Sequence, residues 1–199
     1  MDIVEIKEVP GLFYIKNAIS TTSSGELIQK LDSCKWQPIT PGNLNSRLVQ
    51  HYGYKYDYKK SKINVPTEPF PDYLEELSEQ ALDICRSMNI LPMKDYTFNQ
   101  CIVNNYLPGQ GISKHIDVCS YGEIICCYTV GGGAKMLFRN DEKCHDIYVE
   151  PGSLYIMSKE ARYKWTHEMS SKKTDTIDGK RVARQRRISI TFRNMPLKQ

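Results

Sequence analysis

The pattern of hydrophobic and polar positions changes near residue 96. Before this point, two stretches repeat apolar residues every three or four positions, which is typical of amphipathic helices. One follows Ser23, which with Glu26 has the form of a capping box, and the other spans about 72–88. An earlier strand is expected over 4–15. The first half of the chain therefore predicts one strand and two helices.

Beyond residue 96 the pattern becomes one of short alternating segments separated by turns such as Pro108-Gly109 and Pro151-Gly152. Alternation of this kind is typical of strands with one buried face. So many short strands in about 100 residues predict a mainly β (α+β) sandwich or barrel, with the helices packed on one outer face. The expected strands are 97–106, 123–130, 134–139, 146–150, 153–158, 161–168 and 187–193.

Length and composition limit the class of protein. With 199 residues, 40% of them hydrophobic and 25% charged, the chain predicts one globular domain over 1–199, with an N-terminal extension (1–95) and a core (96–195). It has no long apolar run and no features of a signal peptide, so we expect no membrane segment and an intracellular, cytoplasmic or nuclear protein. The seven cysteines include no C-x-x-C pair and are expected to stay reduced.

The net charge of +4 is unevenly distributed. A basic segment over 170–186 is either a solvated loop or a loop that faces the phosphates of a nucleic acid. Its basic residues are Lys172, Lys173, Lys180, Arg181, Arg184 and Arg186, against Asp175 and Asp178.

A His-x-Asp pair stands out among the polar residues. On an extended segment, the side chains of His115 and Asp117 point to one face. Such a pair also arises by chance, but His167 lies far enough along the chain to return to the same place. Together they predict a two-His-one-carboxylate iron site, which leaves open positions for two oxygens of 2-oxoglutarate and for O2.

The segment 187–193 alternates strictly. Its polar face carries Arg187, Ser189, Thr191 and Arg193. On an edge strand this face would meet solvent, whereas inside a barrel it would need a buried anion such as a dicarboxylate. Because six residues separate the arginines by roughly 20 Å, we expect one to bind the distal carboxylate and the other to reach toward the metal.

These features resemble the AlkB family of Fe(II)- and 2-oxoglutarate-dependent oxygenases. The resemblance covers about 47–193 and rests on the stretch from Asn104 to Asp117, on Trp165-Thr-His167 and on Arg187-x5-Arg193. It implies a double-stranded β-helix (jelly-roll) fold, with iron bound by three catalytic residues and with 2-oxoglutarate and O2 as co-substrates. It implies His115, Asp117 and His167 as metal ligands, and Asn104, Tyr106, Arg187, Ser189 and Arg193 as cofactor contacts.

The sequence departs from the family at two positions. Ser189 stands where the family often has Asn, and that cofactor contact is then lost or replaced by water. Cys119 stands where many members have an acidic residue that helps to read the base. The second departure puts simple repair-type recognition of a base in doubt.

A tyrosine-rich stretch precedes the core. Tyr52, Tyr54, Tyr56 and Tyr58 recur at a spacing of two, with lysines between and after them. They predict either sheet packing or a platform for a nucleotide. The resemblance implies a nucleotide-recognition lid over about 47–62, facing the same mouth as the basic segment, and oxidative demethylation of N-alkylated bases in RNA or single-stranded DNA. The expected substrate contacts are Arg47, Tyr52, Tyr54, Lys55, Tyr56, Arg162 and Trp165.

Two alternatives remain open. The motifs look closest to the AlkB homologue that hydroxylates a modified tRNA wobble uridine, an activity for which this chain would need partner proteins rather than act as a monomer. The other alternative is a catalytically silent binding module that keeps the fold. The roles of His51 and His145 are also open, since each is either near a site or a packing or surface residue.

Overall fold

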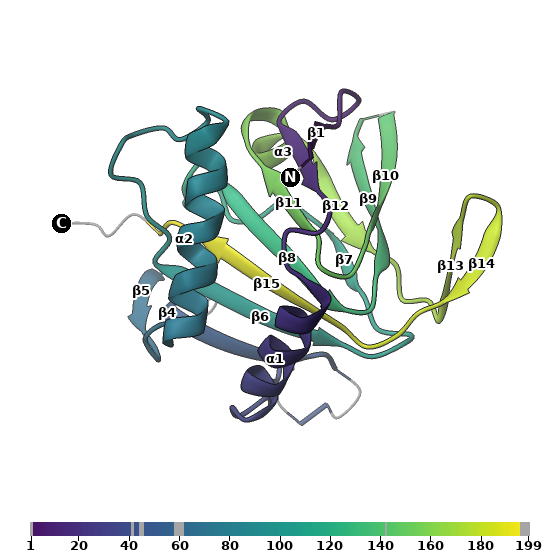
Figure 1. Ribbon diagram of the computed structural model, residues 1–199, viewed down its shortest axis with the longest axis horizontal. Helices are drawn as coiled ribbons and strands as arrows, with labels where there is room; N and C mark the ends of the chain where they lie inside the picture. Colours follow the sequence, from purple (N-terminus) through teal and green to yellow (C-terminus); the bar gives the residue numbers. More distant parts are fainter. Residues whose placement is uncertain (1, 41, 44–45, 58–61, 142, 196–199) are drawn as a thin grey trace.

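The computed structural model describes residues 2–40, 42–43, 46–57, 62–141 and 143–195, with only the backbone for 56–57 and 62–65. Within these ranges the strands form a nine-stranded sheet, a four-stranded sheet and a two-stranded hairpin. The two larger sheets face each other, and the long helices lie outside the larger one (Figure 1). This confirms the expected mainly β jelly roll. No helix of these ranges is long and apolar enough to cross a membrane.

The larger sheet combines strands from both halves of the chain. Its order is β1 (Ile3–Glu5), β2 (Leu12–Ile15), β11 (Leu154–Met157), β8 (Ile125–Gly131), β15 (Arg187–Arg193), β6 (Gln100–Tyr106), β4 (Leu48–Asp57) and β3 (Gln37–Pro38), with β5 (Lys62–Pro66) paired to β4. The strand β15 therefore lies inside the sheet, and the edge-strand alternative does not apply.

The smaller sheet has the order β10 (Lys143–Val149), β9 (Ala134–Asn140), β12 (Thr166–Met169) and β7 (Ile112–His115). A buried apolar cluster fills the space between the two sheets, with Phe138 and Tyr155 in edge contact. A second cluster lies between the larger sheet and the helices and includes Leu31, Leu82 and Phe192. The larger sheet is thus covered on both faces.

The helix α1 (Thr21–Asp32) begins earlier than expected. Its N-cap is Ser20, whose hydroxyl oxygen accepts a hydrogen bond from the Ser23 backbone N–H at 3.1 Å. Ser23 therefore lies in the first turn, which corrects the expected capping box. The apolar positions Leu27 and Leu31 are buried as their spacing predicts.

The helix α2 (Asp72–Ser87) agrees with the expected range of 72–88. It follows Pro71 and carries Asp72 and Glu75 in its first turn, where acidic side chains favour the helix dipole. Asn89 follows its C-cap with φ 54°, a left-handed conformation that asparagine tolerates.

Two expected strands are wrong in part. The range 161–168 contains the short helix α3 (Lys159–Tyr163) followed by β12. The range 4–15 contains β1 and β2 with a turn between them. In that turn Gly11 has φ +87°, and a Cβ there would lie 2.3 Å from the Ser158 carbonyl oxygen, so a side chain does not fit.

The basic segment is a β-hairpin rather than a loop. It consists of β13 (Thr174–Ile177) and β14 (Lys180–Ala183). Asp178 and Gly179 connect the strands with φ 48° and 75°. An Asp-Gly pair with two positive φ angles is the signature of a tight hairpin turn, a sequence signal that the expectation of a loop overlooked.

Candidate active site

The three expected metal ligands converge at one point between the sheets. Their ligand atoms all lie within 4.8 Å of one another. His115 ends β7 and is the cross-strand partner of His167 on β12, and their ring centroids are 4.3 Å apart. Asp117 lies in the loop that follows β7. The sheet register therefore positions two ligands and a short loop supplies the third.

The two imidazoles are prepared to bind a cation. The Nδ1 of His115 lies 2.8 Å from the Ser113 carbonyl oxygen, which only accepts hydrogen bonds, so Nδ1 carries the N–H of this contact and Nε2 is the nitrogen left for a metal. Burial lowers the pKa of His167 to about 4, which keeps this imidazole neutral. Both rings are thus in the form that a metal requires.

Asp117 has one oxygen held and one oxygen free. Arg193 donates to its Oδ1 from Nη2 at 2.7 Å and from Nε at 3.0 Å. Its Oδ2 is buried without a hydrogen-bond donor, 3.4 Å from the Nε2 of His167. Burial acts to raise the pKa of Asp117, but interactions led by the charge of Arg193 bring it down to about 2. The free, ionised oxygen fits a bound metal cation.

The other end of β15 carries a buried cation without a carboxylate. Arg187 is 3% exposed, and its Nη2 donates to the Thr129 hydroxyl at 3.0 Å. Its Nε has no acceptor among the described residues. The Tyr106 ring centroid lies 5.7 Å from its guanidinium carbon. A guanidinium in this state fits the distal carboxylate of a dicarboxylic acid.

Buried polar atoms that lack a hydrogen-bond partner concentrate around the metal ligands and β15. Among the described residues, such side-chain atoms are His51 Nδ1, Gln100 Nε2, Asp117 Oδ2, Trp165 Nε1, His167 Nδ1 and Arg187 Nε. Two belong to metal ligands, three to the face of the larger sheet that turns toward the smaller one, and one lies two residues before His167. Buried groups of this kind are costly unless a ligand or water satisfies them. They therefore mark a binding site.

The comparison with known proteins agrees with this geometry. The sequence model of the 2OG-Fe(II) oxygenase superfamily matches residues 11–193. The chain belongs to this superfamily. It is accordingly an Fe(II)- and 2-oxoglutarate-dependent dioxygenase that uses O2, which disfavours the silent-module alternative.

Relatives place this oxygenase in the AlkB group. The chain is 31% identical over 194 residues to uncharacterized protein L905 of Acanthamoeba polyphaga mimivirus, covering 95% of this chain and 87% of that protein. It is 28% identical over 218 residues to tRNA (carboxymethyluridine(34)-5-O)-methyltransferase alkbh8 of Xenopus tropicalis, covering 96% of this chain but only 34% of that protein. The solved structure of OsALKBH1 has the same fold, with a TM-score of 0.72, 18% identity, and coverage of 97% of this chain and 100% of that one.

The remaining cofactor candidates of the oxygenase lie together near Arg187. Tyr106 and Ser189 are buried and lie on the neighbouring strands β6 and β15. The Asn104 side-chain oxygen accepts from Nε of Arg47 at 3.0 Å, and Arg47 also lies 5.7 Å from the Tyr106 ring centroid. The expectation for Arg47 was a substrate contact, whereas its observed neighbours are two cofactor candidates.

Arg162 differs from its expected role at the substrate mouth. It is 1% exposed. Its guanidinium donates to four backbone carbonyls in the loop that carries Asp117, those of Asp117, Val118, Tyr121 and Gly122, at 2.7–3.2 Å. With four of its five N–H groups donating to carbonyls of this loop, the side chain braces the metal-ligand loop instead of facing substrate.

Two aromatic candidates are also buried away from substrate. Tyr52 packs in the cluster beneath the helices, and its hydroxyl donates to Gln50 at 3.1 Å. Trp165 is 2% exposed, inside the cluster between the sheets. Neither ring has a free face on which a base can stack, which corrects both expectations.

The outer part of the tyrosine-rich stretch stays accessible. Gly53, with φ +76°, interrupts the alternation of β4, because a Cβ there would lie 2.0 Å from the Asn99 carbonyl oxygen. After it Tyr54 is partly exposed and Lys55 is exposed. The side chain of Tyr56, and residues 58–61 entirely, lie outside the described residues. Tyr54 and Lys55 thus remain candidates for substrate contact.

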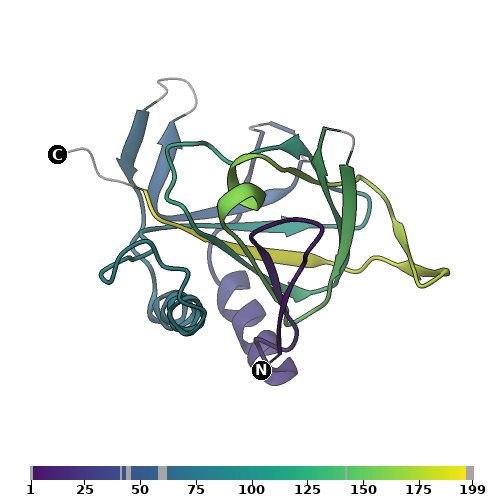
Figure 2. The same ribbon diagram turned by 90° about the horizontal axis from the view of Figure 1, so that it is seen from above.

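The lid and the basic hairpin do not share one mouth. In the register of the larger sheet, Gly53 aligns with Gln100 and Arg193, and β5 pairs with the part of β4 beyond Gly53. The β13–β14 hairpin instead precedes Arg187. The two hairpins lie at opposite ends of β15, as both views show (Figures 1 and 2). The expected arrangement is therefore wrong in this respect.

Sequence reasoning missed Gln100 and left the role of His51 open. Gln100 is fully buried, and its side-chain oxygen accepts from Arg193 Nη1 at 3.3 Å. His51 lies on the same face of the sheet, and burial, followed by the charges of Lys55 and Arg193, lowers its pKa to about 4. The alternation of β6 was a usable signal for Gln100, since it shares a face with Asn104 and Tyr106. His145 lies half-buried on β10, in register with Phe138 and thus two strands away from His167, and it does not belong to the cluster of metal ligands.

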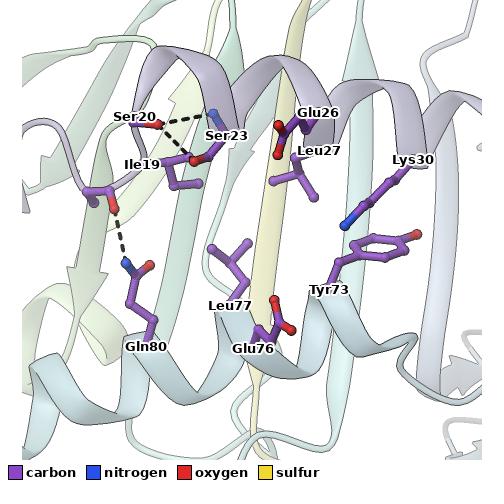
Figure 3. Close-up of a pocket in the computed structure, with 11 residues that line it drawn as sticks. Ile19, Ser20, Ser23, Glu26, Leu27, Lys30, Tyr73, Glu76, Leu77 and Gln80 are labelled. Atoms are coloured by element: carbon purple, nitrogen blue, oxygen red, sulfur yellow. Dashed lines mark hydrogen bonds between the residues drawn. The ribbon is translucent and has the colours of Figure 1, made fainter.

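A separate groove lies on the helical side of the larger sheet. It has a volume of about 360 Å³ and runs between α1 and α2. Leu27 and Leu77 face each other across it, and Glu26 and Glu76 point into it from the two helices (Figure 3). The larger sheet separates this groove from the metal ligands, so it has no part in the oxidation.

Proposed function

We propose that this oxygenase oxidises an alkylated base in RNA or single-stranded DNA and thereby demethylates it. The observation that carries the reaction is the placement, between the two sheets, of the ligands His115, Asp117 and His167 opposite the strand that carries Arg187, a buried cation without a carboxylate partner among the described residues. The substrate class is supported by similarity to a tRNA-modifying relative. It is also supported by the accessible Tyr54 and Lys55 beside the Arg193 end, since an aromatic face and a cation suit a base and its phosphate.

The bound groups would supply the oxidant, and side chains of the protein would hold these groups in place. Fe(II) and 2-oxoglutarate together supply the oxidant that transfers one oxygen atom of O2 to a C–H bond, while the 2-oxoglutarate ends as succinate and CO2. His115, Asp117 and His167 would hold the metal, and Arg187 with Tyr106 the distal carboxylate. Arg193 keeps Asp117 ionised and fixed in place.

The fate of the product depends on the carbon that is oxidised. A hydroxylated carbon bonded to nitrogen releases formaldehyde, which amounts to demethylation. A hydroxylated carbon bonded to carbon is stable. The chain's own residues would perform the same steps in both cases, because they would bind the co-substrate and hold the metal between the two sheets.

A second candidate is the hydroxylation of a modified wobble uridine in tRNA. The observation that favours it is the 28% identity to the Xenopus tropicalis tRNA (carboxymethyluridine(34)-5-O)-methyltransferase over 96% of this chain. The chain spans about a third of that relative's length. Methyl transfer and any further RNA recognition would then be the work of partner proteins.

One experiment separates the two candidates. The protein is incubated with Fe(II), 2-oxoglutarate and air, together with total tRNA or with N-methylated RNA and DNA oligonucleotides. Succinate and digested nucleosides are measured by mass spectrometry. Loss of a methyl group with formaldehyde supports demethylation, and gain of one oxygen atom on a uridine supports hydroxylation.

The matched control is Asp117→Asn with the same substrates, together with unmodified oligonucleotides. If no nucleic acid increases succinate above the uncoupled level, while the protein still binds Mn(II) and 2-oxoglutarate, the nucleic-acid substrate is excluded and only the oxygenase assignment remains.

A further inference from the structure

The β13–β14 hairpin is a feature that the oxidation itself does not use. It projects from the body of the protein in both views (Figures 1 and 2). All four residues of β14 are exposed. A projecting two-stranded ribbon buries little surface, so the fold gains little stability from it. Its presence and composition call for another explanation.

A buried ion pair fixes the base of the hairpin. Arg184 contacts both oxygens of Asp175, from Nε at 2.6 Å and from Nη2 at 2.7 Å, and both side chains are 5% exposed. Arg184 also donates to the Ser170 carbonyl at 2.6 Å, and Asp175 accepts from the Lys135 backbone N–H at 3.1 Å. The ribbon is therefore held in a defined direction by its base.

The exposed cations of the 170–186 segment have no acidic partner in the part of the chain that the structure describes. Of the six basic residues in 170–186, Arg184 pairs with Asp175 and Arg186 with Asp32. The other four are exposed, and among the described residues none of them forms an ion pair. They are Lys172, Lys173, Lys180 and Arg181. Neighbouring residues of a strand point to opposite faces, so Lys180 and Arg181 present positive charge on both faces of the ribbon.

These cations lie well away from the metal. Asp175 of this ion pair accepts a hydrogen bond from the backbone of Lys135 on β9. Phe138 is three residues further along β9 and is the cross-strand neighbour of His167. Three strand residues span about 10 Å, so Lys180 and Arg181 on the outer part of the ribbon lie at least about 10 Å from His167. Stacked nucleotides advance by about 3.4 Å each, and this distance corresponds to several nucleotides.

We propose that the β13–β14 hairpin is a remote docking site for the phosphate backbone of a polynucleotide. The docking site binds nucleotides that flank the reacting base, so only a substrate several nucleotides long reaches both it and the metal. This inference rests on the proposed function and deepens it, because it selects long or folded nucleic acids over short fragments. Backbone contacts carry little sequence information, so the hairpin adds affinity and not base selection.

The test compares two substrate lengths with the same modified base, a trinucleotide and a 20-nucleotide strand. The variant is Lys180→Gln/Arg181→Gln, which leaves the Asp175–Arg184 pair intact. For the long strand we expect KM to rise about tenfold with kcat unchanged, and the slope of log affinity against log salt to become shallower by about two. For the trinucleotide we expect no change in KM.

The matched control is Lys35→Gln/Lys94→Gln, which removes the same charge from exposed positions outside the hairpin. A general effect of net charge would act equally in both double variants. Equal changes for the two substrate lengths, or no change for either, would overturn the proposal. Thermal denaturation of both variants identifies any loss of fold.

Failure of the proposed function is distinguishable from failure of the docking site. Binding of unmodified 20-nucleotide RNA is measured by fluorescence anisotropy and needs no turnover. If the wild-type protein binds this RNA and the hairpin variant binds it equally well, the docking site is wrong whatever the enzyme oxidises. If the variant binds weakly but no nucleic acid is oxidised, the docking site stands and the proposed reaction fails.

Discussion

The two faces of β15 are both buried but have opposite chemistry. Ile188, Ile190 and Phe192 point toward the helices and are at most 1% exposed. Arg187, Ser189, Thr191 and Arg193 point toward the smaller sheet and are 3–8% exposed. Burial therefore does not distinguish the two faces. Unsatisfied hydrogen bonds do, since Arg187 has one on the inner face and the outer face is hydrocarbon.

This difference assigns separate tasks to the two faces. Buried hydrocarbon stabilises the fold at roughly 25 cal/mol per Å². Buried polar groups without full partners cost free energy until a ligand satisfies them. Outer-face substitutions should accordingly affect stability and leave the chemistry intact, whereas inner-face substitutions should do the reverse.

The largest effect is expected for Asp117→Asn. The amide keeps the shape of the carboxylate but removes its charge, so turnover should fall to background and Mn(II) binding should be lost in calorimetry. Arg193 then remains buried without its partner, which should cost about 3 kcal/mol of stability. Asp146→Asn is the control, because Asp146 pairs with Lys135 near the surface and should have little effect. Mn(II) affinity equal to wild type in Asp117→Asn would contradict the metal site.

Phe192→Ala is expected to have a large effect on stability rather than on the reaction. The Phe192 ring is fully buried and contacts the rings of Phe70, Phe98 and Tyr128. Its removal should lower the free energy of unfolding by about 3–5 kcal/mol in urea denaturation. At low temperature the folded protein should keep its KM for 2-oxoglutarate within about twofold, because Phe192 lies on the outer face of β15 and the cofactor candidates lie on the inner face. A changed KM for 2-oxoglutarate in a variant that is still folded would contradict the separate tasks of the two faces of β15.

Arg187→Met tests the inner face directly. The loss of two charge-assisted hydrogen bonds to the distal carboxylate should cost about 3 kcal/mol, which is roughly a 100-fold rise in KM for 2-oxoglutarate. Because the buried Arg187 has no carboxylate partner within the described ranges, the ligand-free variant should be at least as stable as wild type.

Thermal denaturation with Mn(II) decides this prediction. Addition of 2-oxoglutarate should raise the Tm of the wild type and not that of Arg187→Met. A ligand-free Tm several degrees below wild type would show instead that Arg187 is a structural residue.

The sequence was most informative where the physics is local. The alternation of β15 gave both of its faces correctly, since the period of a strand needs no knowledge of the rest of the chain. The order of His115, Asp117 and His167 likewise sufficed to expect that they meet. The prediction of a strand over 161–168 failed because Ala161, Tyr163 and Trp165 alternate as in a strand. The chain instead forms a turn of helix, which brings Ala161, Arg162 and Trp165 to the same buried side.

The role of Arg162 had no readable signal. Its four acceptors are backbone carbonyls about 40–45 residues earlier in the chain, and every residue carries a carbonyl. The burial of Tyr52 was hidden for a similar reason, because it depends on α2 folding back over β4. Long-range packing of this kind leaves no periodic trace.

Arg162→Lys should therefore weaken the metal site from a distance. A lysine retains the charge but not the four directed hydrogen bonds to the loop of Asp117. Mn(II) affinity should fall about 10- to 100-fold, while the affinity for 2-oxoglutarate at saturating metal changes little. Arg139→Lys, at a partly exposed pair with Glu168, is the control. An unchanged Mn(II) affinity would mean that the loop keeps its shape without Arg162.

The smallest effects are expected from two neighbouring substitutions on β15. Ile190→Val removes one methylene group from the outer face and should cost about 1 kcal/mol, a fall in Tm of about 2–4 °C, with KM unchanged. Thr191→Val changes the inner face, but the Thr191 hydroxyl already donates to Cys127 Sγ at 3.4 Å, a weak acceptor. Neither Tm nor the KM for 2-oxoglutarate should change measurably. If Thr191→Val raises this KM as Arg187→Met does, polarity alone would mark the active face. If it does not, unsatisfied hydrogen bonds mark it, and Thr191 is polar, inward-facing and still outside the site.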